Sequence, residues 1–462
     1  MRCIAVACWT ALSLSIFVAV EPALAADTFI LATGRRDPRI YAIDFNAALR
    51  TTNDRTPNAI VSRSKTQVDR LDGVPVGDPA NIVLSEDHKT AYVLNHHGAI
   101  NNAEFLQHGG RSSISVMNVQ KMIDPHFDNT DAALERSYDG GYFGGVGLLV
   151  LPDLLIVSHS ENWLTEDGSN VIAFVDRRTG SRRGQIQMDL GHPDHVCPDF
   201  PVPFVSPTPP PVVPLLSPDP NFGCWPNPEV LALGNGSDGR TYLFSGNAGT
   251  DDVSVMDLQS ALQGVPVVEV APRIGVQTGP WGIKASPNGK LIAVTARESA
   301  QVAFEGNTIS IIDVDLARTG SPDAEVARVR VGTDDPGGQA RPFTVAWTPD
   351  GREIIVANYR TNNVSIVDVS RALAHDPHAE VARIPVTRLA DADGIVRPGN
   401  PKGTAVTSDG RYVVVSGGPQ LLNFPPSGTV WIIDLQKRAV VATVTGVGDD
   451  PYGLTILEGK PE

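Results

Sequence analysis

Hydrophobic and polar positions alternate along this chain in short runs, and the same order of runs returns several times. Residues 347–369, WTPDGREIIVANYRTNNVSIVDV, begin with a tight turn and continue with an apolar run rich in β-branched residues, and a polar loop then leads into a second such run. Related stretches occupy residues 85–119, 236–258, 285–314 and 407–435. Alternation with a period of two, bounded by Asp-Gly or Asn-Gly, predicts β-hairpins.

A further apolar stretch completes each unit, as in residues 324–332 and 438–448. Four antiparallel strands in each repeat are typical of a β-propeller blade, and one blade cannot bury both of its faces, so several must stack around an axis. We expect the first strands of six complete blades to begin near Pro79, Gly141, Pro228, Pro280, Pro342 and Pro401.

The two ends of the chain supply one more blade between them. Residues 28–45 provide only its later strands, whereas residues 449–457, DDPYGLTIL, match first strands such as GPWGIKASP and NPKGTAVTS. The sequence therefore predicts an all-β fold, a seven-bladed β-propeller with four antiparallel strands per blade, closed by the C-terminal strand joining the N-terminal blade. The second and third blades are less regular, and six or eight blades also fit the pattern.

Three stretches resemble a known family: GIKASPNGKLIAVTAR, IVANYRTNNVSIVDV and PYGLTIL are similar to the YVTN-type repeats of lactonase-like seven-bladed propellers. The resemblance covers most of the chain. It implies the fold, and it implies lactone hydrolysis, service as a subunit of a redox enzyme, or a role without known activity. Such repeats are a signature of the fold and do not identify catalytic residues.

Composition and net charge limit the kinds of partner that the protein can bind. The chain has 462 residues, of which 42% are hydrophobic and 19% charged, and 52 acidic against 37 basic residues give a net charge of −15. A surface this acidic repels phosphates, so nucleic acid is not an expected partner. An acidic surface is compatible with bound cations.

The first 25 residues have the features of a secretory signal peptide. Arg2 precedes an apolar run from Ile4 to Val20, and Ala23-Leu24-Ala25 forms a cleavage site. We expect cleavage after Ala25, with an uncleaved anchor as the alternative, and no later segment is apolar enough to span a membrane. The propeller would then comprise residues 26–462 and be periplasmic or secreted.

A proline-rich insertion covers residues 191–228 and contains the two cysteines that remain after such cleavage, Cys197 and Cys224. In an oxidising compartment these two residues are expected to form a disulfide that pins the insertion. A pair of metal ligands is the alternative, although no Cys-x-x-Cys motif is present.

The longest connections between second and third strands, residues 95–111, 158–170, 296–307 and 417–428, all belong to one face of the predicted ring. We expect this face to bind a small molecule or a protein partner. Histidines concentrate there, and they suggest a divalent-metal site for zinc or a similar ion that nearby carboxylates complete. The candidate metal ligands are His96, His97, His108, His159, His192, His195, Glu104 and Glu161. Ordinary solvated or hydrogen-bonded loop histidines are the alternative.

Side chains at the ends of the second strands form a further candidate site around the channel mouth. Amides there could hold calcium, and arginines could bind an anion; pairing with aspartates of neighbouring blades is the alternative. The candidate ligand-binding residues are Arg35, Asn95, Asn247, Arg297, Asn358 and Arg360.

Three functional hypotheses follow. The first is an exported propeller that binds a small molecule, a metal or a protein partner on the face with the long connections. The second is a metal-assisted lactone or ester hydrolase, and the third is an accessory subunit of a periplasmic redox enzyme. The chain has no Gly-x-Ser-x-Gly, Cys-x-x-Cys-His or nucleotide-binding motif, so the chemistries that depend on them are not expected.

Overall fold

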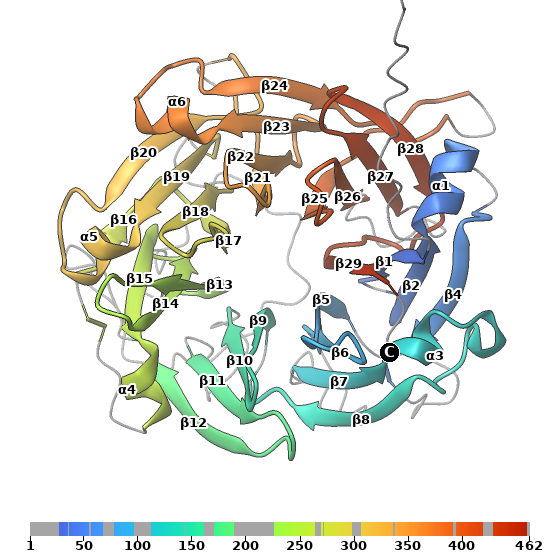
Figure 1. Ribbon diagram of the computed structural model, residues 1–462, viewed down its shortest axis with the longest axis horizontal. Helices are drawn as coiled ribbons and strands as arrows, with labels where there is room; N and C mark the ends of the chain where they lie inside the picture. Colours follow the sequence, from blue (N-terminus) through green and yellow to red (C-terminus); the bar gives the residue numbers. More distant parts are fainter. Residues whose placement is uncertain are drawn as a thin grey trace, which may run out of the picture.

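The computed structural model describes residues 27–35, 37–54, 57–67, 78–96, 112–142, 144–160, 171–188, 226–263, 269–270, 272–297, 306–335, 338–390, 394–418 and 428–459. In this part of the chain seven antiparallel sheets are arranged around a central axis, as Figure 1 shows. The seven-bladed propeller predicted from the repeats is confirmed.

Each blade consists of four strands that follow one another from the axis outward. Blade 1 has β29 (Leu454–Glu458), β1 (Thr28–Thr33), β2 (Arg39–Asp44) and β4 (Ile60–Lys65). Blade 2 has β5 (Pro79–Leu84), β6 (Thr90–Asn95), β7 (Ser113–Asn118) and β8 (Leu134–Asp139). Blade 3 has β9 (Gly145–Val150), β10 (Leu154–His159), β11 (Val171–Asp176) and β12 (Arg182–Gln187). Blade 4 has β13 (Pro228–Asn235), β14 (Thr241–Asn247), β15 (Asp252–Asp257) and β16 (Ile274–Gly275).

The remaining blades repeat this order. Blade 5 has β17 (Pro280–Ala285), β18 (Leu291–Ala296), β19 (Thr308–Asp313) and β20 (Glu325–Arg330). Blade 6 has β21 (Pro342–Trp347), β22 (Glu353–Asn358), β23 (Asn363–Asp368) and β24 (Glu380–Pro385). Blade 7 has β25 (Pro401–Val406), β26 (Tyr412–Gly417), β27 (Thr429–Asp434) and β28 (Ala439–Thr445), and the short β3 (Asn53–Asp54) pairs with β28 in parallel. Five of the six predicted first-strand starts match; the first strand of blade 3 begins at Gly145, four residues after the predicted Gly141.

Blade 1 closes the ring. Its innermost strand β29 comes from the C-terminal end of the chain and pairs with β1, with Ile456 opposite Ile30 and Leu457 opposite Phe29. The predicted shared blade is therefore confirmed, and this pairing removes a sheet edge that would otherwise be exposed.

The hydrophobic core is divided into layers between the blades. Seven clusters of buried residues each contain side chains from two neighbouring blades, as where Ile30 of blade 1 packs in one cluster with Val414 of blade 7. Because the middle strands are covered on both faces, all six residues of β26 are buried, whereas the outer strand β12 exposes most of its side chains. Burial on both faces explains why the middle strands are continuous apolar runs.

Glycines in the first strands allow neighbouring blades to approach closely at the axis. A Cβ atom added at Gly282 would lie 2.4 Å from the carbonyl oxygen of Phe343, and one at Gly403 would lie 2.3 Å from that of Tyr452. No side chain fits at these positions without moving the next blade. The repeated glycine after the first residues of the inner strands thus sets the diameter of the channel.

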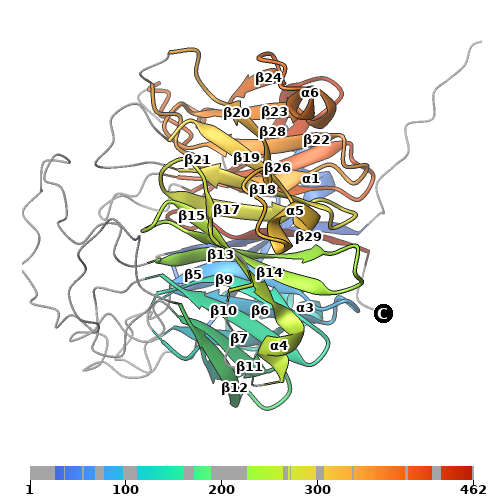
Figure 2. The same cartoon turned by 90° about the vertical axis from the view of Figure 1, so that its left-hand side faces the viewer.

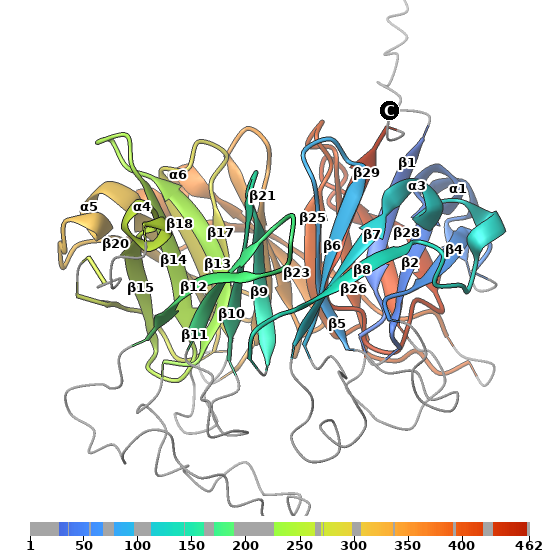
Figure 3. The same cartoon turned by 90° about the horizontal axis from the view of Figure 1, so that it is seen from below.

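Five short helices follow third strands: α1 (Phe45–Thr51), α3 (Val119–Met122), α4 (Leu258–Leu262), α5 (Val314–Arg318) and α6 (Val369–Leu373), and a short 3-10 helix, η1 (Pro125–Phe127), follows α3. Figures 2 and 3 show the α-helices toward one face of the disc. The aspartate that ends the strand caps the helix in several blades, as Asp368 does by accepting a hydrogen bond from the backbone nitrogen of Arg371.

Several predictions concern residues that the structure does not describe. The signal peptide, the disulfide between Cys197 and Cys224, and nearly all of the 191–228 insertion lie outside the described residues. Within the described part of the chain, no helix has the length and hydropathy needed to cross a membrane.

Candidate functional site

The first strands carry a ring of side chains at one end of the central channel. In six blades the inner strand, or the turn before it, has a proline followed by a residue that differs from blade to blade. These residues are Ala80, Glu229, Trp281, Phe343, Lys402 and Tyr452, and Val146 takes the same place in blade 3. All but Ala80 line a cavity of about 270 Å³, which we call the channel-mouth cavity.

A second set of side chains closes the cavity from the ends of the second strands. Arg35, His96, Ser160 and Arg297 follow the second strands of blades 1, 2, 3 and 5 and line the cavity. Backbone hydrogen bonds hold three of them in place, because His96 N donates to Asp78 O at 2.7 Å, Ser160 N to Gly144 O at 3.0 Å and Arg297 N to Gly279 O at 2.8 Å. Regular pairing of the strands thus delivers these side chains to the same position in each blade.

Aromatic rings form one wall of the channel-mouth cavity. Trp281, Phe343 and Tyr452 come from three different blades, with ring centroids 5.3 Å apart for Trp281 and Phe343 and 5.2 Å apart for Phe343 and Tyr452. The indole nitrogen of Trp281 donates a hydrogen bond to the hydroxyl of Tyr452. Burial, and to a lesser extent the Glu229 carboxylate, raises the pKa of Tyr452 well above its ordinary value, so this phenol stays protonated.

Two arginines lie against these rings. The guanidinium carbon of Arg297 is 3.7 Å from the centroid of Trp281, and that of Arg35 is 5.7 Å from the centroid of Tyr452. Such stacking fixes the plane of a guanidinium, and the edge of a guanidinium can donate paired hydrogen bonds to an anion. Arg35 also pairs with Asp78, with 3.0 Å between Nε and Oδ1.

The third cation is buried with its partner. Lys402 pairs through Nζ with Oδ1 of Asp450, and only 1% and 5% of the two side-chain surfaces are exposed. Burial lowers the pKa of Lys402 to about 8, although the charge of Asp450 acts against that shift and the nearby Arg35 and Arg341 add to it. At neutral pH the lysine is still mostly a cation, and it faces the cavity.

His96 contributes an imidazole. Only 6% of its surface is exposed, and Nδ1 is 3.1 Å from the carbonyl oxygen of Gly145. Since a carbonyl only accepts, Nδ1 carries the hydrogen, and in the neutral ring Nε2 then holds the lone pair. A histidine oriented in this way is suited to accept a proton from water.

The structure brings three of the predicted site residues to the channel-mouth cavity: Arg35, His96 and Arg297. Three predicted asparagines end the second strands of blades 2, 4 and 6, one residue before the position that His96 and Arg297 occupy in their blades. Their amides point into their own blades. Asn95 donates to Ser115, Asn247 to Asp252 and Asn358 to Ser365, and all three are fully buried. Arg360 is exposed, bonds to the Gln339 side chain, and does not line the cavity.

His159 is buried inside blade 3. Its Nδ1 is 3.2 Å from Val171 O and its Nε2 is 3.0 Å from Gly140 O, so both nitrogens face backbone carbonyls. Burial lowers the pKa of His159 to about 4 and keeps the ring neutral.

The other candidate metal ligands lie outside the described residues: His97, His108, His192, His195, Glu104 and Glu161. Among the residues that are described, no three histidine, cysteine, aspartate or glutamate side chains are grouped so that they could hold a metal ion. The metal site therefore stays a prediction.

Sequence reasoning missed the residues that follow the first-strand prolines, notably Trp281, Lys402 and Tyr452, and also Asp450 and Glu229. A signal for them was present. The stretches GPWG, NPKG and DPYG share the proline and the glycine, and the variable position between these two residues faces the cavity. Variation at one point of an otherwise repeated motif is expected where each blade supplies a different side chain to a shared site.

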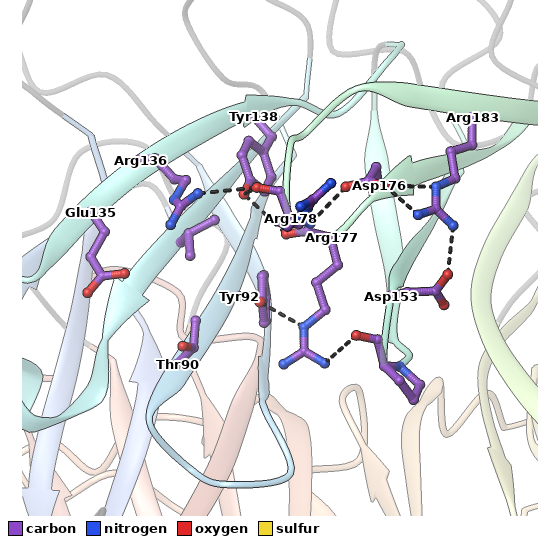
Figure 4. Close-up of a pocket in the computed structure, with 12 residues that line it drawn as sticks. Thr90, Tyr92, Glu135, Arg136, Tyr138, Asp153, Asp176, Arg177, Arg178 and Arg183 are labelled. Carbon is purple, nitrogen blue, oxygen red and sulfur yellow. Dashed lines mark hydrogen bonds and ion pairs between the residues drawn. The ribbon is translucent and has the colours of Figure 1, made fainter.

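A larger cavity of about 510 Å³ lies on the outer part of the ring between blades 2 and 3, shown in Figure 4. Two of its arginines already join the two blades. Arg177 of blade 3 donates from Nε to the hydroxyl of Tyr92 in blade 2 at 2.8 Å, and Arg136 of blade 2 donates to the carbonyl oxygen of Arg178 at 3.2 Å. Arg183 pairs within blade 3, with Asp153 at 2.7 Å and with Asp176. Hydrogen bonds from the Thr179 backbone and from Arg183 hold the pKa of Asp176 well below its usual range, as expected for a structural ion pair.

Comparisons with known proteins support the fold. No family model matches the chain, and no curated protein matches it significantly. The YVTN-type resemblance is therefore a prediction still, while the propeller architecture is shown.

Solved structures of similar architecture include lactonase-like propellers. The periplasmic gluconolactonase of Pseudomonas aeruginosa is 14% identical, with a TM-score of 0.54, and the match covers 93% of this chain and 99% of that one. A Bacteroides uniformis protein provisionally assigned as a 6-phosphogluconolactonase is 12% identical, with a TM-score of 0.54 and coverage of 93% and 100%. A functionally unknown protein from Desulfotomaculum acetoxidans gives 11%, a TM-score of 0.55 and coverage of 94% and 99%. At these identities the likeness shows a common fold.

Proposed function

We propose that this chain hydrolyses, in the channel-mouth cavity, lactones of hydroxylated carboxylic acids that carry a further anionic group such as a phosphate. The observation that carries the proposal is the composition of that cavity, in which Arg35, Arg297 and Lys402 surround a space that also holds His96. Two propellers of similar architecture are described as a gluconolactonase and, provisionally, a 6-phosphogluconolactonase. Their activities agree with this chemistry.

Binding of an anionic lactone would use the cations and the rings together. The stacked guanidinium of Arg297 offers paired N–H donors to a carboxylate, phosphate or carbonyl oxygen. The aromatic wall fits the less polar face of a sugar-like ring. Since Lys402 is mostly charged at neutral pH and loses its proton near pH 8, affinity for the anion would fall as the pH rises through that value.

Hydrolysis would then follow a general-base route. His96 removes a proton from water through Nε2, and the water oxygen bonds to the lactone carbonyl carbon. Negative charge on the carbonyl oxygen is stabilised by the guanidinium and ammonium groups of Arg297 and Lys402. The carbon–oxygen bond of the ring breaks, the ring oxygen takes the proton from His96, and the product is an open hydroxy acid.

The first hypothesis, binding of a small molecule, a metal or a protein partner without turnover, concerns the face with the long connections, and it stays a proposal; binding of an unopened lactone in the channel-mouth cavity would be one form of it. Export through cleavage after Ala25 and action in the periplasm are also proposals. They are supported by the predicted signal sequence and by the periplasmic location of the similar Pseudomonas aeruginosa enzyme. A metal-assisted variant would need ligands among the residues that are not described; each step above uses described side chains.

The test is hydrolysis of glucono-1,5-lactone and its 6-phosphate by the purified protein, followed as acid release and corrected for spontaneous opening. We expect His96→Gln to lower kcat about 100-fold, the lower end of what a general base contributes. A matched control is His126→Gln, because His126 lies in η1 with 88% of its side chain exposed, and its rate should equal that of the wild type.

Two outcomes would contradict the proposal. One is a wild-type protein that opens neither lactone, with or without added divalent metal; binding of the lactone in that case would support the first hypothesis. The other is a His96→Gln variant that retains the full rate.

A further inference from the structure

The central channel contains a second space beside the channel-mouth cavity. This space, which we call the axial chamber, has a volume of about 480 Å³ and is lined by the first strands of all seven blades. Most of its lining is apolar, as with Ile82, Leu148, Val230, Val345 and Leu454. Its size is within the range of about 300–1,000 Å³ that is usual for small-molecule sites.

The aromatic wall separates the two spaces. Tyr452 lines both of them, whereas Trp281 and Phe343 line only the channel-mouth cavity and their next neighbours, Gly282 and Thr344, line only the axial chamber. The hydrogen bond between Trp281 and Tyr452 and the contacts among the three rings hold this wall together. The axial chamber is therefore distinct from the proposed hydrolytic site.

Lys284 is the one charged residue among the described residues that line the axial chamber. Its backbone carbonyl accepts a hydrogen bond of 3.0 Å from the indole nitrogen of Trp347, which fixes the strand at this point. Within the described part of the chain, no carboxylate lies within ion-pair distance of the Lys284 ammonium group, in contrast to the pairing of Lys402 with Asp450.

Lys284 has no counter-ion among the described residues. Its side chain is exposed, so solvent reaches it, and partial desolvation by the surrounding blades lowers its pKa. An anion that enters the chamber would supply the missing partner in a space whose walls are mostly apolar.

We propose that the axial chamber binds a small monocarboxylate with an apolar body, whose carboxylate pairs with Lys284. One ammonium group matches one monovalent head group. A phosphate would bring a second charge and a third oxygen into a chamber whose described lining contains no further cation, so the carboxylate is the better match. The apolar body would cover the side chains of the inner strands and gain the free energy of burial.

The experiment is isothermal titration calorimetry of the purified protein with octanoate, with octanol as a neutral probe of the same length. We expect octanoate to bind at one site and Lys284→Met to weaken it at least 10-fold, since the ion pair is lost while the apolar surface is retained. Lys284→Arg keeps the charge and should restore most of the affinity. Octanol should bind both wild type and Lys284→Met with similar, lower affinity.

Hydrolysis of lactones should be unchanged in Lys284→Met, because that residue does not line the channel-mouth cavity. This separates a failure of the binding proposal from a failure of the proposed activity. The binding proposal is overturned if octanoate does not bind the wild type, or if it binds Lys284→Met and the wild type equally.

Discussion

Single residues in this propeller carry charge at places where the fold itself would favour apolar side chains. Lys402 and Asp450 are both nearly fully buried, and an ion pair in such a place contributes little net stability because both groups lose their hydration. Lys284 and the stacked Arg297 lie along the same axis. Function is the most direct explanation for this concentration of charge, and the site proposals depend on it.

His159 permits a test at the residue scale, because its charge state is coupled to folding. Its pKa is about 4 in the folded protein against an ordinary 6.5, so the unfolded chain binds the proton more readily. Stability from this residue is fully present above pH 6.5 and is lost as the pH falls through 4. The loss is on the order of 3 kcal/mol, from about 1.4 kcal/mol for each pKa unit.

Urea denaturation of the wild type and of His159→Gln at pH 7 and pH 4 measures this loss. The wild type should lose more stability between the two pH values than the variant does, because only the wild type has this histidine to protonate. Equal losses in the two proteins would show that His159 does not couple protonation to folding.

At the scale of elements, the repeated order of turns and apolar runs is enough to locate most strands. Hairpin turns such as SPNG and TPDG and the apolar runs beside them predicted the strands of blades 5 and 6 closely, because both depend on local sequence. The start of blade 3 was misplaced by four residues. The glycines between Gly140 and Gly147 give no local signal that separates turn from strand.

The candidate site was harder to predict, because a shift of one residue along a strand decides which side chain points to the channel axis. Asn95 and His96 are neighbours, yet Asn95 bonds within its blade and His96 lines the cavity. Pattern alone could not distinguish them, since both are polar residues at the end of a strand. The distances between blades that bring Trp281, Phe343 and Tyr452 together depend on how the whole ring closes.

Capping of the short helices offers a test at this scale. Asp368 ends β23 and accepts a 2.9 Å hydrogen bond from the backbone nitrogen of Arg371 in α6. Asp368→Ala should lower the free energy of unfolding by about 1 kcal/mol, because an N-cap is lost. Asp368→Asn keeps the acceptor and should change stability by only a few tenths of a kcal/mol. Urea midpoints of the three proteins make the comparison, and an alanine variant as stable as the asparagine variant would contradict it.

At the scale of the molecule, closure of the ring joins two ends of the chain in one sheet. Thr33 N donates to Gly453 O at 2.9 Å, so Thr455, two residues farther along, is opposite Leu31 at a hydrogen-bonded position of the antiparallel ladder. Blade 1 is thus held shut by hydrogen bonds between segments that are more than 400 residues apart.

Thr455→Pro tests this closure. Proline removes the backbone donor, and we expect a loss of about 2 kcal/mol as a carbonyl of β1 is left without its partner. Thr455→Val keeps the donor and the shape of the side chain and should be close to wild type. Thermal melts measure the loss, and size-exclusion chromatography should show association of the proline variant through its freed strand edge. A proline variant as stable and monodisperse as the valine variant would argue against ring closure as a major source of stability.

Blade 1 also has a consequence for how the protein is made. The strand that completes it, β29, leaves the ribosome after all the other described strands, whereas its partner β1 leaves before them. Six blades can form in order as the chain emerges, but β1 must wait until all six have been synthesised before its inner neighbour β29 exists. Assembly therefore ends in one late event, and until then the growing ring stays open.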